Sequence, residues 1–175
     1  FYVFMGENFI IPLNGLAAGE TIFSWHADKE FFERFDNSEI LQAQFDARAS
    51  VEKSGQYIGV DCNVQGQVTV ECDRCLGELV LPVDVKIMLS VKYGENEVSD
   101  DLSEGEREVV AVSADSAELD MAQIIYDYVC LSLPMQRVHA PGGCDPAAMK
   151  YLEGGDAQDG EAADSPFGML KDFLG

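Results

Sequence analysis

Positive charge is scarce in this sequence. Its 175 residues contain 11 Lys and Arg against 32 Asp and Glu, which gives a formal net charge of −21. A surface of this kind repels the phosphate backbone of nucleic acids and favours basic partners. We therefore expect contacts with basic proteins and no binding to DNA.

Long apolar runs are also lacking. None approaches the roughly 18 residues that span a bilayer, because Gly6, Glu7 and Asn8 interrupt the apolar opening FYVFMGENFIIPLNGL. This opening has neither a basic leader nor a small-residue cleavage site of the kind that directs secretion. These absences favour a soluble chain in the cytoplasm, without a membrane partner.

Catalytic signatures are few. The chain has 2 histidines, His26 and His139, and it contains no G-x-S-x-G sequence, no Walker-type loop and no dinucleotide-binding glycine pattern. His26 follows Trp25 in a predicted strand, where a structural role is the simpler interpretation. We expect a protein without enzymatic activity.

The length and composition favour one domain with additions at its end. With 47% hydrophobic residues the chain can bury one sizeable core, which we assign to residues 1–150. Residues 151–165 contain five acids, no base and few large apolar groups, so they cannot offset the entropy of ordering and are predicted to be an acidic flexible linker. Residues 166–175 are apolar again and predict a short amphipathic segment that docks back on the domain or binds a partner.

Alternating apolar residues predict a β-rich middle. Period-two patterns run through residues 41–51, 58–72 and 79–93, with a turn at Gly55 and a turn or bulge near Gly66. Connections as short as these exclude crossover helices, so the strands should form an antiparallel meander. The segments FIIPLNGL, TIFSWHA and REVVAVSA are typical of further strands.

Two helices are expected beside this sheet. Asp28 opens a short N-terminal helix in DKEFFERF. A longer helix begins at Asp120, which with Gln123 resembles a capping box, and ends before Pro134. The apolar residues at helical spacing in this longer helix are Met121, Ile124, Ile125, Tyr128 and Leu131. The predicted fold class is α+β, a mainly antiparallel sheet with a short N-terminal helix and one longer C-terminal helix packed on it.

One pair of the five cysteines, Cys72 and Cys75, forms a C-x-x-C motif in ECDRCLGEL. Thiolates at this spacing can bind one zinc ion, but a closed structural site needs two more ligands. The sequence VHAPGGCDP offers His139 and Cys144 around a flexible bend, so a site of these four residues is chemically possible. Reduced structural cysteines and a redox pair are the alternatives, and the redox interpretation lacks the helix N-terminus that usually activates such thiols. Small buried hydrophobes are the expected role of the others, Cys62 and Cys130.

Three phrases of the chain carry a resemblance to a known family. They are VQGQVTVECDRCLGELVLPVDV, then LSLPMQRVHAPGGCDP, and finally DSPFGMLKDFL. In them a strand with a central glycine, Gly66, runs into a C-x-R-C-L turn, and the later helix ends in L-x-L-P. In these places, and in its N-terminal IPLNGL phrase, the chain resembles the YceD-like family, also called domain of unknown function 177. The signature positions that carry over are Cys72, Arg74, Cys75, Leu76, Pro134, His139 and Cys144.

The resemblance implies a role in accumulation of the large-subunit (23S) ribosomal RNA, and no catalytic activity is attached to the family. Together with the acidic charge, it predicts a non-enzymatic factor for large-subunit assembly that contacts a basic ribosomal protein or assembly factor. Arg74, Leu76 and Arg137 are the candidate partner-binding residues, and Arg74, Arg137 and His139 could form a local patch that reaches precursor rRNA. The alternative is a zinc-stabilised or thiol-based scaffold or sensor with only an indirect ribosomal role.

Overall fold

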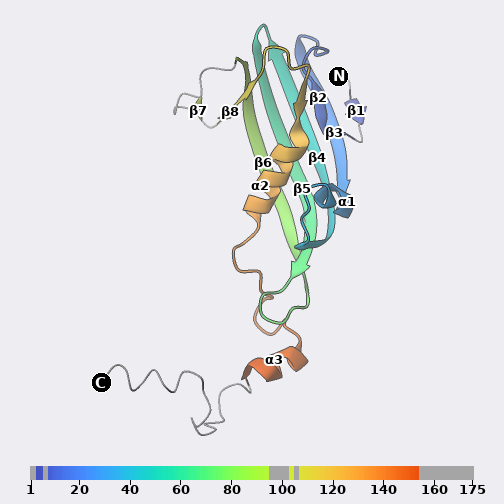
Figure 1. Ribbon diagram of the computed structural model, residues 1–175, viewed down its shortest axis with the longest axis vertical. Coiled ribbons are helices and arrows are strands. Elements are labelled where there is room, and N and C mark those ends of the chain that lie inside the picture. The colour runs from blue at the N-terminus through green and yellow to red at the C-terminus, as the bar shows by residue number, and fades with distance from the viewer. Residues whose placement is uncertain (1–2, 6–7, 95–102, 105–106, 154–175) are drawn as a thin grey trace, which may run out of the picture. The chain divides into compact units, whose positions relative to one another are not determined.

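The computed structural model describes residues 3–5, 8–94, 103–104 and 107–153. In this part the chain is α+β, with a seven-stranded sheet, a two-stranded sheet and three helices (Figure 1). It divides into two compact units, Phe1–Val138 and His139–Gly175.

Four antiparallel strands form the centre of the first unit. They are β3 (Gly19–Asp28), β4 (Ile40–Ser54), β5 (Tyr57–Glu71) and β6 (Glu78–Tyr93), each paired with the next. Every second side chain of β4, β5 and β6 is buried along most of their length, as the period-two pattern predicts. Gly55 connects β4 to β5 with a φ of 63°, a left-handed conformation that glycine adopts without steric cost.

Parallel pairs flank these central strands and make the sheet mixed. β1 (Val3–Met5) runs parallel to β3, and β8 (Arg107–Val112) runs parallel to β6. The two-residue strand β7 (Ser103–Glu104) completes the edge beside β8. Arg107 also forms an ion pair of 2.9 Å with Asp61 of β5 and so helps to hold β8 in place. The α+β class and the mainly antiparallel sheet are thus confirmed, with parallel pairing added near the edges.

The turn or bulge predicted near Gly66 does not form, because β5 passes through this position with Gly66 paired to Phe45. A bulge would move the residues that follow to the opposite face of the sheet, yet Val64 and Val68 are both fully buried. The glycine is instead required by the close approach of β4. A Cβ atom on Gly66 would lie 2.2 Å from the carbonyl oxygen of Gln44.

Two helices of the first unit pack on the face of the sheet that is turned toward the viewer in Figure 1. α1 (Lys29–Glu33) contacts β3 and β4 and begins at Asp28, whose carboxylate accepts a 2.9 Å hydrogen bond from the helix. α2 (Met121–Ser132) contacts β6 and crosses the sheet (Figure 1). A two-stranded antiparallel sheet of β2 (Ile10–Pro12) and β9 (Glu118–Asp120) leads directly into α2. None of the helices in the described ranges is long and apolar enough to cross a membrane.

Aromatic rings fill the core beside α1. Phe31 and Phe32 are buried, and the ring centroid of Phe31 lies 4.8 Å from that of Phe9. Phe35 is the second residue after the end of α1 and is half-buried, and its ring stacks on Tyr126 of α2 at 4.2 Å. These rings join the N-terminal strands, α1 and α2 into one core.

Only some of the apolar residues at helical spacing in α2 are buried. Its buried residues follow a four-residue spacing and are Met121, Ile125 and Val129. Ile124 and Tyr128 are only half-buried, and Leu131 is 83% exposed. Successive residues of a helix turn by about 100°, so Leu131 lies about 200° around the helix from Val129 and points away from the sheet.

The described residues of the second unit form a loop, residues 139–145, followed by α3 (Pro146–Glu153). Asp145 begins this helix, because its carboxylate accepts a 2.9 Å hydrogen bond from the amide of Ala147, and Pro146 suits the first helical position. The last residues of α3 fall within the range predicted to be a linker. The rest of that linker and the predicted C-terminal segment lie outside the described residues.

Candidate metal centre at the cysteine turn

The connection between β5 and β6 is a tight turn. Cys72 donates its amide hydrogen to the carbonyl of Gly77 (2.8 Å), and Leu76 donates to the carbonyl of Cys72 (2.9 Å). Leu76 has a φ of 57°, which is an uncommon conformation for a residue with a large side chain. The closed turn holds the two cysteines of the C-x-x-C motif at one end of the sheet, where Cys72 is buried and Cys75 is half-buried.

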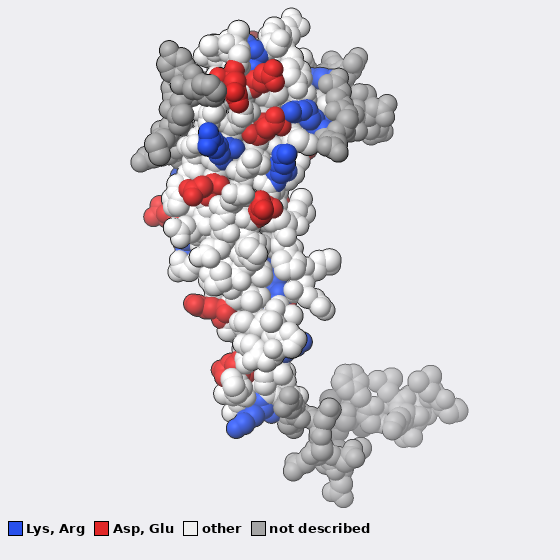
Figure 2. All heavy atoms as spheres, turned by 180° about the vertical axis from the view of Figure 1, so that it is seen from behind, with Lys and Arg blue, Asp and Glu red and all other residues white. Residues whose placement is uncertain are grey.

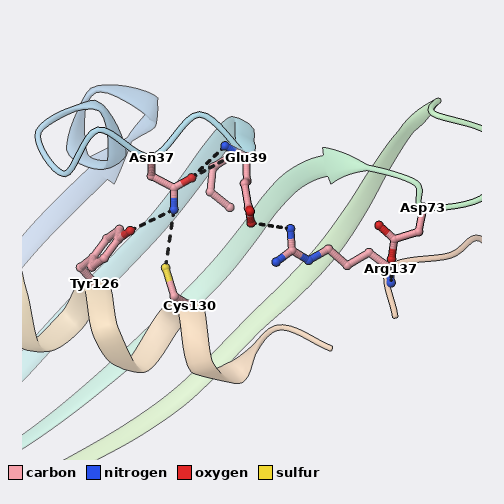
Figure 3. A network of polar contacts seen from close by, with 7 residues as sticks. Asn37, Glu39, Asp73, Tyr126, Cys130 and Arg137 are labelled. Carbon is pink, nitrogen blue, oxygen red and sulfur yellow. Dashed lines mark hydrogen bonds and ion pairs between the residues drawn. The ribbon is translucent and has the colours of Figure 1, made fainter. Parts of the chain in front are cut away.

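Asp73 lies between the two cysteines and binds the chain that follows α2. Its amide donates to the carbonyl of Arg137 (2.7 Å), and its carboxylate accepts the amide hydrogen of Arg137 (2.7 Å). The guanidinium group of Arg137 forms an ion pair of 2.9 Å with Glu39 (Figure 3). Arg137 is therefore fixed against the cysteine turn two residues before His139. Sequence patterns do not reveal these roles of Asp73 and Glu39, because the partners are 64 and 98 residues away from Arg137.

In the second unit, the loop brings His139 and Cys144 together. Gly143 donates to the carbonyl of Ala140 (2.8 Å), and Gly142 adopts a φ of 83°. The Sγ atom of Cys144 lies 3.8 Å from Nδ1 of His139. This separation suits two ligands of one tetrahedral ion, because metal–ligand bonds of roughly 2.0 to 2.3 Å place ligand atoms about 3 to 4 Å apart.

The four predicted ligands form one group. One ligand atom from each of Cys72, Cys75, His139 and Cys144 lies within 4.8 Å of the others. Three cysteine sulfurs and one imidazole nitrogen are a ligand set typical of structural zinc sites. The described residues thus contain a group that could hold a metal ion, in agreement with the expected zinc site.

Cys62 and Cys130 do not belong to this group. Cys62 is fully buried in β5, and burial raises the pKa of its thiol to about 12. Cys130 is half-buried near the end of α2, where burial raises its pKa and Asn37 donates a 3.8 Å hydrogen bond to its sulfur (Figure 3). It lines an open pocket of about 390 Å³ together with Tyr126 and Arg137. The expected core position is confirmed for Cys62, whereas Cys130 reaches the surface.

The three candidate partner-binding residues lie in or against the cysteine turn. Arg74 is exposed, and Leu76 is exposed over 74% of its surface. Arg137 is half-buried, and the carboxylate of Glu39 offsets its charge. Arg74 and Leu76 are therefore accessible to a partner, while Arg137 also has a structural role in the turn.

The fold and the site define the class of this chain, a mainly antiparallel α+β protein with a group of three cysteines and one histidine that could hold a metal ion. Residues 60–174, more than half of the chain, match the family described as "Large ribosomal RNA subunit accumulation protein YceD". The chain belongs to this family, which confirms the resemblance over the matched range, whereas the N-terminal phrase IPLNGL lies before it. Searches of curated proteins and of solved structures found no match.

Proposed function

We propose that this chain is a non-enzymatic factor that supports accumulation of the large-subunit (23S) ribosomal RNA through contacts with basic proteins. The observation that carries the proposal is the family match over residues 60–174. The net charge of −21 supports protein contacts over direct RNA contacts, because such a surface repels phosphate groups and attracts basic side chains.

The charges on the face of the sheet opposite α2 also support protein contacts over direct RNA contacts. Lys and Arg side chains alternate there with Asp and Glu side chains (Figure 2). In the strand register, Arg48 of β4 faces Asn63 of β5, which faces Lys86 of β6, while the neighbouring row contains Asp46 and Asp84. On the described part of this face the basic residues therefore alternate with acids and form no continuous strip along which an RNA backbone could bind.

The placement of the two histidines supports a role without catalysis. Nδ1 of His26 lies 2.8 Å from Asp46, but both side chains stand on the open sheet and are 57% and 81% exposed. A catalytic His–Asp pair acts beside a nucleophile in a site that excludes water. The second histidine, His139, belongs to the candidate metal group.

Affinity purification of the full-length tagged chain at moderate salt tests this proposal. We expect proteins of the large ribosomal subunit to co-purify and to remain bound after nuclease treatment, because the contact is made by protein. An unrelated acidic protein of similar net charge, carrying the same tag, is the control for nonspecific attraction. Recovery of neither large-subunit proteins nor precursor rRNA would refute the proposal, and loss of all proteins after nuclease treatment would refute the protein-mediated contact.

A second candidate function is that of a zinc-stabilised scaffold or sensor with an indirect ribosomal role, and the observation that favours it is the group of Cys72, Cys75, His139 and Cys144. A zinc ion held by these residues would supply a structural cross-link, since all four coordination positions would be taken by protein. Elemental analysis of protein purified without added metal is the test. We expect close to one zinc per chain, lost in a Cys72→Ser, Cys75→Ser double variant and kept in the matched control Cys130→Ser. Metal-free protein whose stability equals that of the double variant would dismiss this candidate.

A further inference from the structure

The flank of α2 beside strand β8 carries apolar side chains. Leu131 is 83% exposed, and Ile124 and Tyr128 are half-buried. At positions i, i+4 and i+7, these three residues share one side of the helix. Together with Cys130 they line an open groove of about 640 Å³, and Met135, just beyond the helix, is fully exposed. We take this accessible apolar surface beside a groove as a candidate docking surface.

Acidic side chains border this groove, which we name the α2 groove and define by Ile124, Tyr128, Leu131, Glu108 and Asp127. Glu108 comes from β8 and accepts a 2.5 Å hydrogen bond from the hydroxyl of Tyr128, so its carboxylate is held at the border. This bond raises the pKa of Tyr128 to about 12. Asp127 comes from α2 itself. The groove thus combines an apolar floor with carboxylates contributed by two elements.

The charges decide which occupant fits. A second copy of this chain would bring the same carboxylates against themselves, with a net charge of −21 on each partner. A nucleic acid or an anionic lipid surface would bring phosphates to the same border. A protein segment with apolar anchors flanked by Lys or Arg fits the groove, because its anchors can pack on the apolar floor and its cations are attracted to the carboxylates at the border.

We propose that the α2 groove is the docking site for a basic, apolar-anchored segment of a partner protein. An apolar anchor of the partner packs on Leu131, Ile124 and the ring of Tyr128, and its cations approach Glu108 and Asp127. The inference rests on the proposed function for its choice of partner, a basic protein of the large ribosomal subunit, and it assigns to that partner a surface outside the cysteine turn.

The first test compares two exposed apolar residues of the full-length chain. Leu131 in the α2 groove and Val80 on β6, which is 55% exposed, are each replaced by Asp, so that both variants lose an apolar side chain and gain one negative charge. Each immobilised variant is incubated with the total protein extracted from purified large ribosomal subunits, and bound proteins are quantified by mass spectrometry. We expect Leu131→Asp to weaken binding of a basic protein about tenfold or more, and Val80→Asp to bind like the wild type.

The outcomes of this comparison are distinct. Equal binding by the wild type and Leu131→Asp overturns the α2 groove and leaves the proposed function standing. Failure of the wild type to bind any large-subunit protein overturns both. Circular dichroism and thermal unfolding of the two Asp variants show whether each is folded. A charge-reversal pair repeats the comparison without changing an apolar residue. It compares Asp127→Lys in the α2 groove with Asp84→Lys on the exposed face of the sheet. Only Asp127→Lys should weaken binding.

The second test identifies the occupant directly. A photo-crosslinking amino acid at position 131 of the full-length chain is activated in the presence of the same extract, and the adducts are mapped by mass spectrometry. Adducts with Lys- or Arg-rich segments of a large-subunit protein support the proposal. The proposal is overturned if position 131 instead forms adducts with residues 166–175 of the same chain or with a second copy of the chain.

Discussion

Replacement of Gly66 by alanine should strongly destabilise the first unit. The new Cβ would lie 2.2 Å from the carbonyl oxygen of Gln44 and 2.5 Å from Cα of Phe45, both backbone atoms of β4. Carbon–oxygen contacts are normally about 3.3 Å or longer, so β4 would have to move by about 1 Å against its pairing with β3 and β5. Overpacking costs about 1–3 kcal/mol where side chains can adapt. Because two backbones meet here, we expect a loss of about 3 kcal/mol or more from the roughly 5–15 kcal/mol that stabilises a typical domain.

Urea unfolding, followed by the fluorescence of the buried Trp25, measures this loss. With a denaturant dependence of about 1–3 kcal/mol per molar urea, the midpoint should fall by about 1 M or more. Gly15→Ala is the matched control, because its Cβ would meet only Pro12 at 3.9 Å, which is an ordinary contact. The control should change the free energy of unfolding by less than about 1 kcal/mol. A Gly66→Ala variant as stable as Gly15→Ala would refute the close-approach explanation.

Three further predictions concern single groups. Cys62 should resist a thiol-specific reagent at mildly alkaline pH, because burial raises its pKa to about 12; rapid labelling of the folded chain, seen by peptide mapping, would contradict this burial. The hydrogen bond of Tyr128 favours its protonated form, so the stability it contributes is complete below pH 10.0 and is lost as the pH rises toward about 12. Glu108→Gln should lower the pKa of Tyr128 in a tyrosine-selective NMR titration, and an unchanged value would argue against the bond. Asp73→Ala removes the acceptor of a 2.7 Å hydrogen bond and should cost about 1 kcal/mol in urea unfolding, against less than about 0.5 kcal/mol for Asp84→Ala; equal losses would exclude a structural role of Asp73.

The long central strands could be predicted because a period of two is a local property of the sequence. The same pattern continues through Gly66, since Val64 and Val68 lie on the same face. A glycine within a strand can mark a bulge or a close approach, and only the neighbouring strand distinguishes the two. The parallel pairs of β1 and β8 could not be foreseen for a similar reason. They depend on which edge a short strand reaches, and no local pattern encodes that choice.

The start of α2 could also be predicted, because capping is local. The carboxylate of Asp120 accepts a 2.8 Å hydrogen bond from the amide of Ala122. The buried face could not be predicted as well, because apolar residues surround much of the helix and the sheet selects among them. The sheet selects the stripe that contains Ile125 and Val129, which leaves Leu131 in the α2 groove.

The candidate metal ligands could be predicted from chemistry alone. The spacing of Cys72 and Cys75 and the bend between His139 and Cys144 indicate a ligand set even though more than sixty residues separate the two halves. The support around them could not be predicted, since Asp73 acts through a hydrogen bond to a distant backbone. The family could be recognised from its motifs, while the α2 groove required the three-dimensional structure.

The amount of large-subunit rRNA in cells that lack this chain tests the central claim most directly. The ratio of large-subunit to small-subunit rRNA is measured in cells with the gene deleted, and again after expression of the wild type, Leu131→Asp or Val80→Asp. We predict that the ratio falls on deletion and that the wild type and Val80→Asp restore it, whereas Leu131→Asp does not. A ratio that stays unchanged after deletion would contradict a role of this chain in the accumulation of large-subunit rRNA.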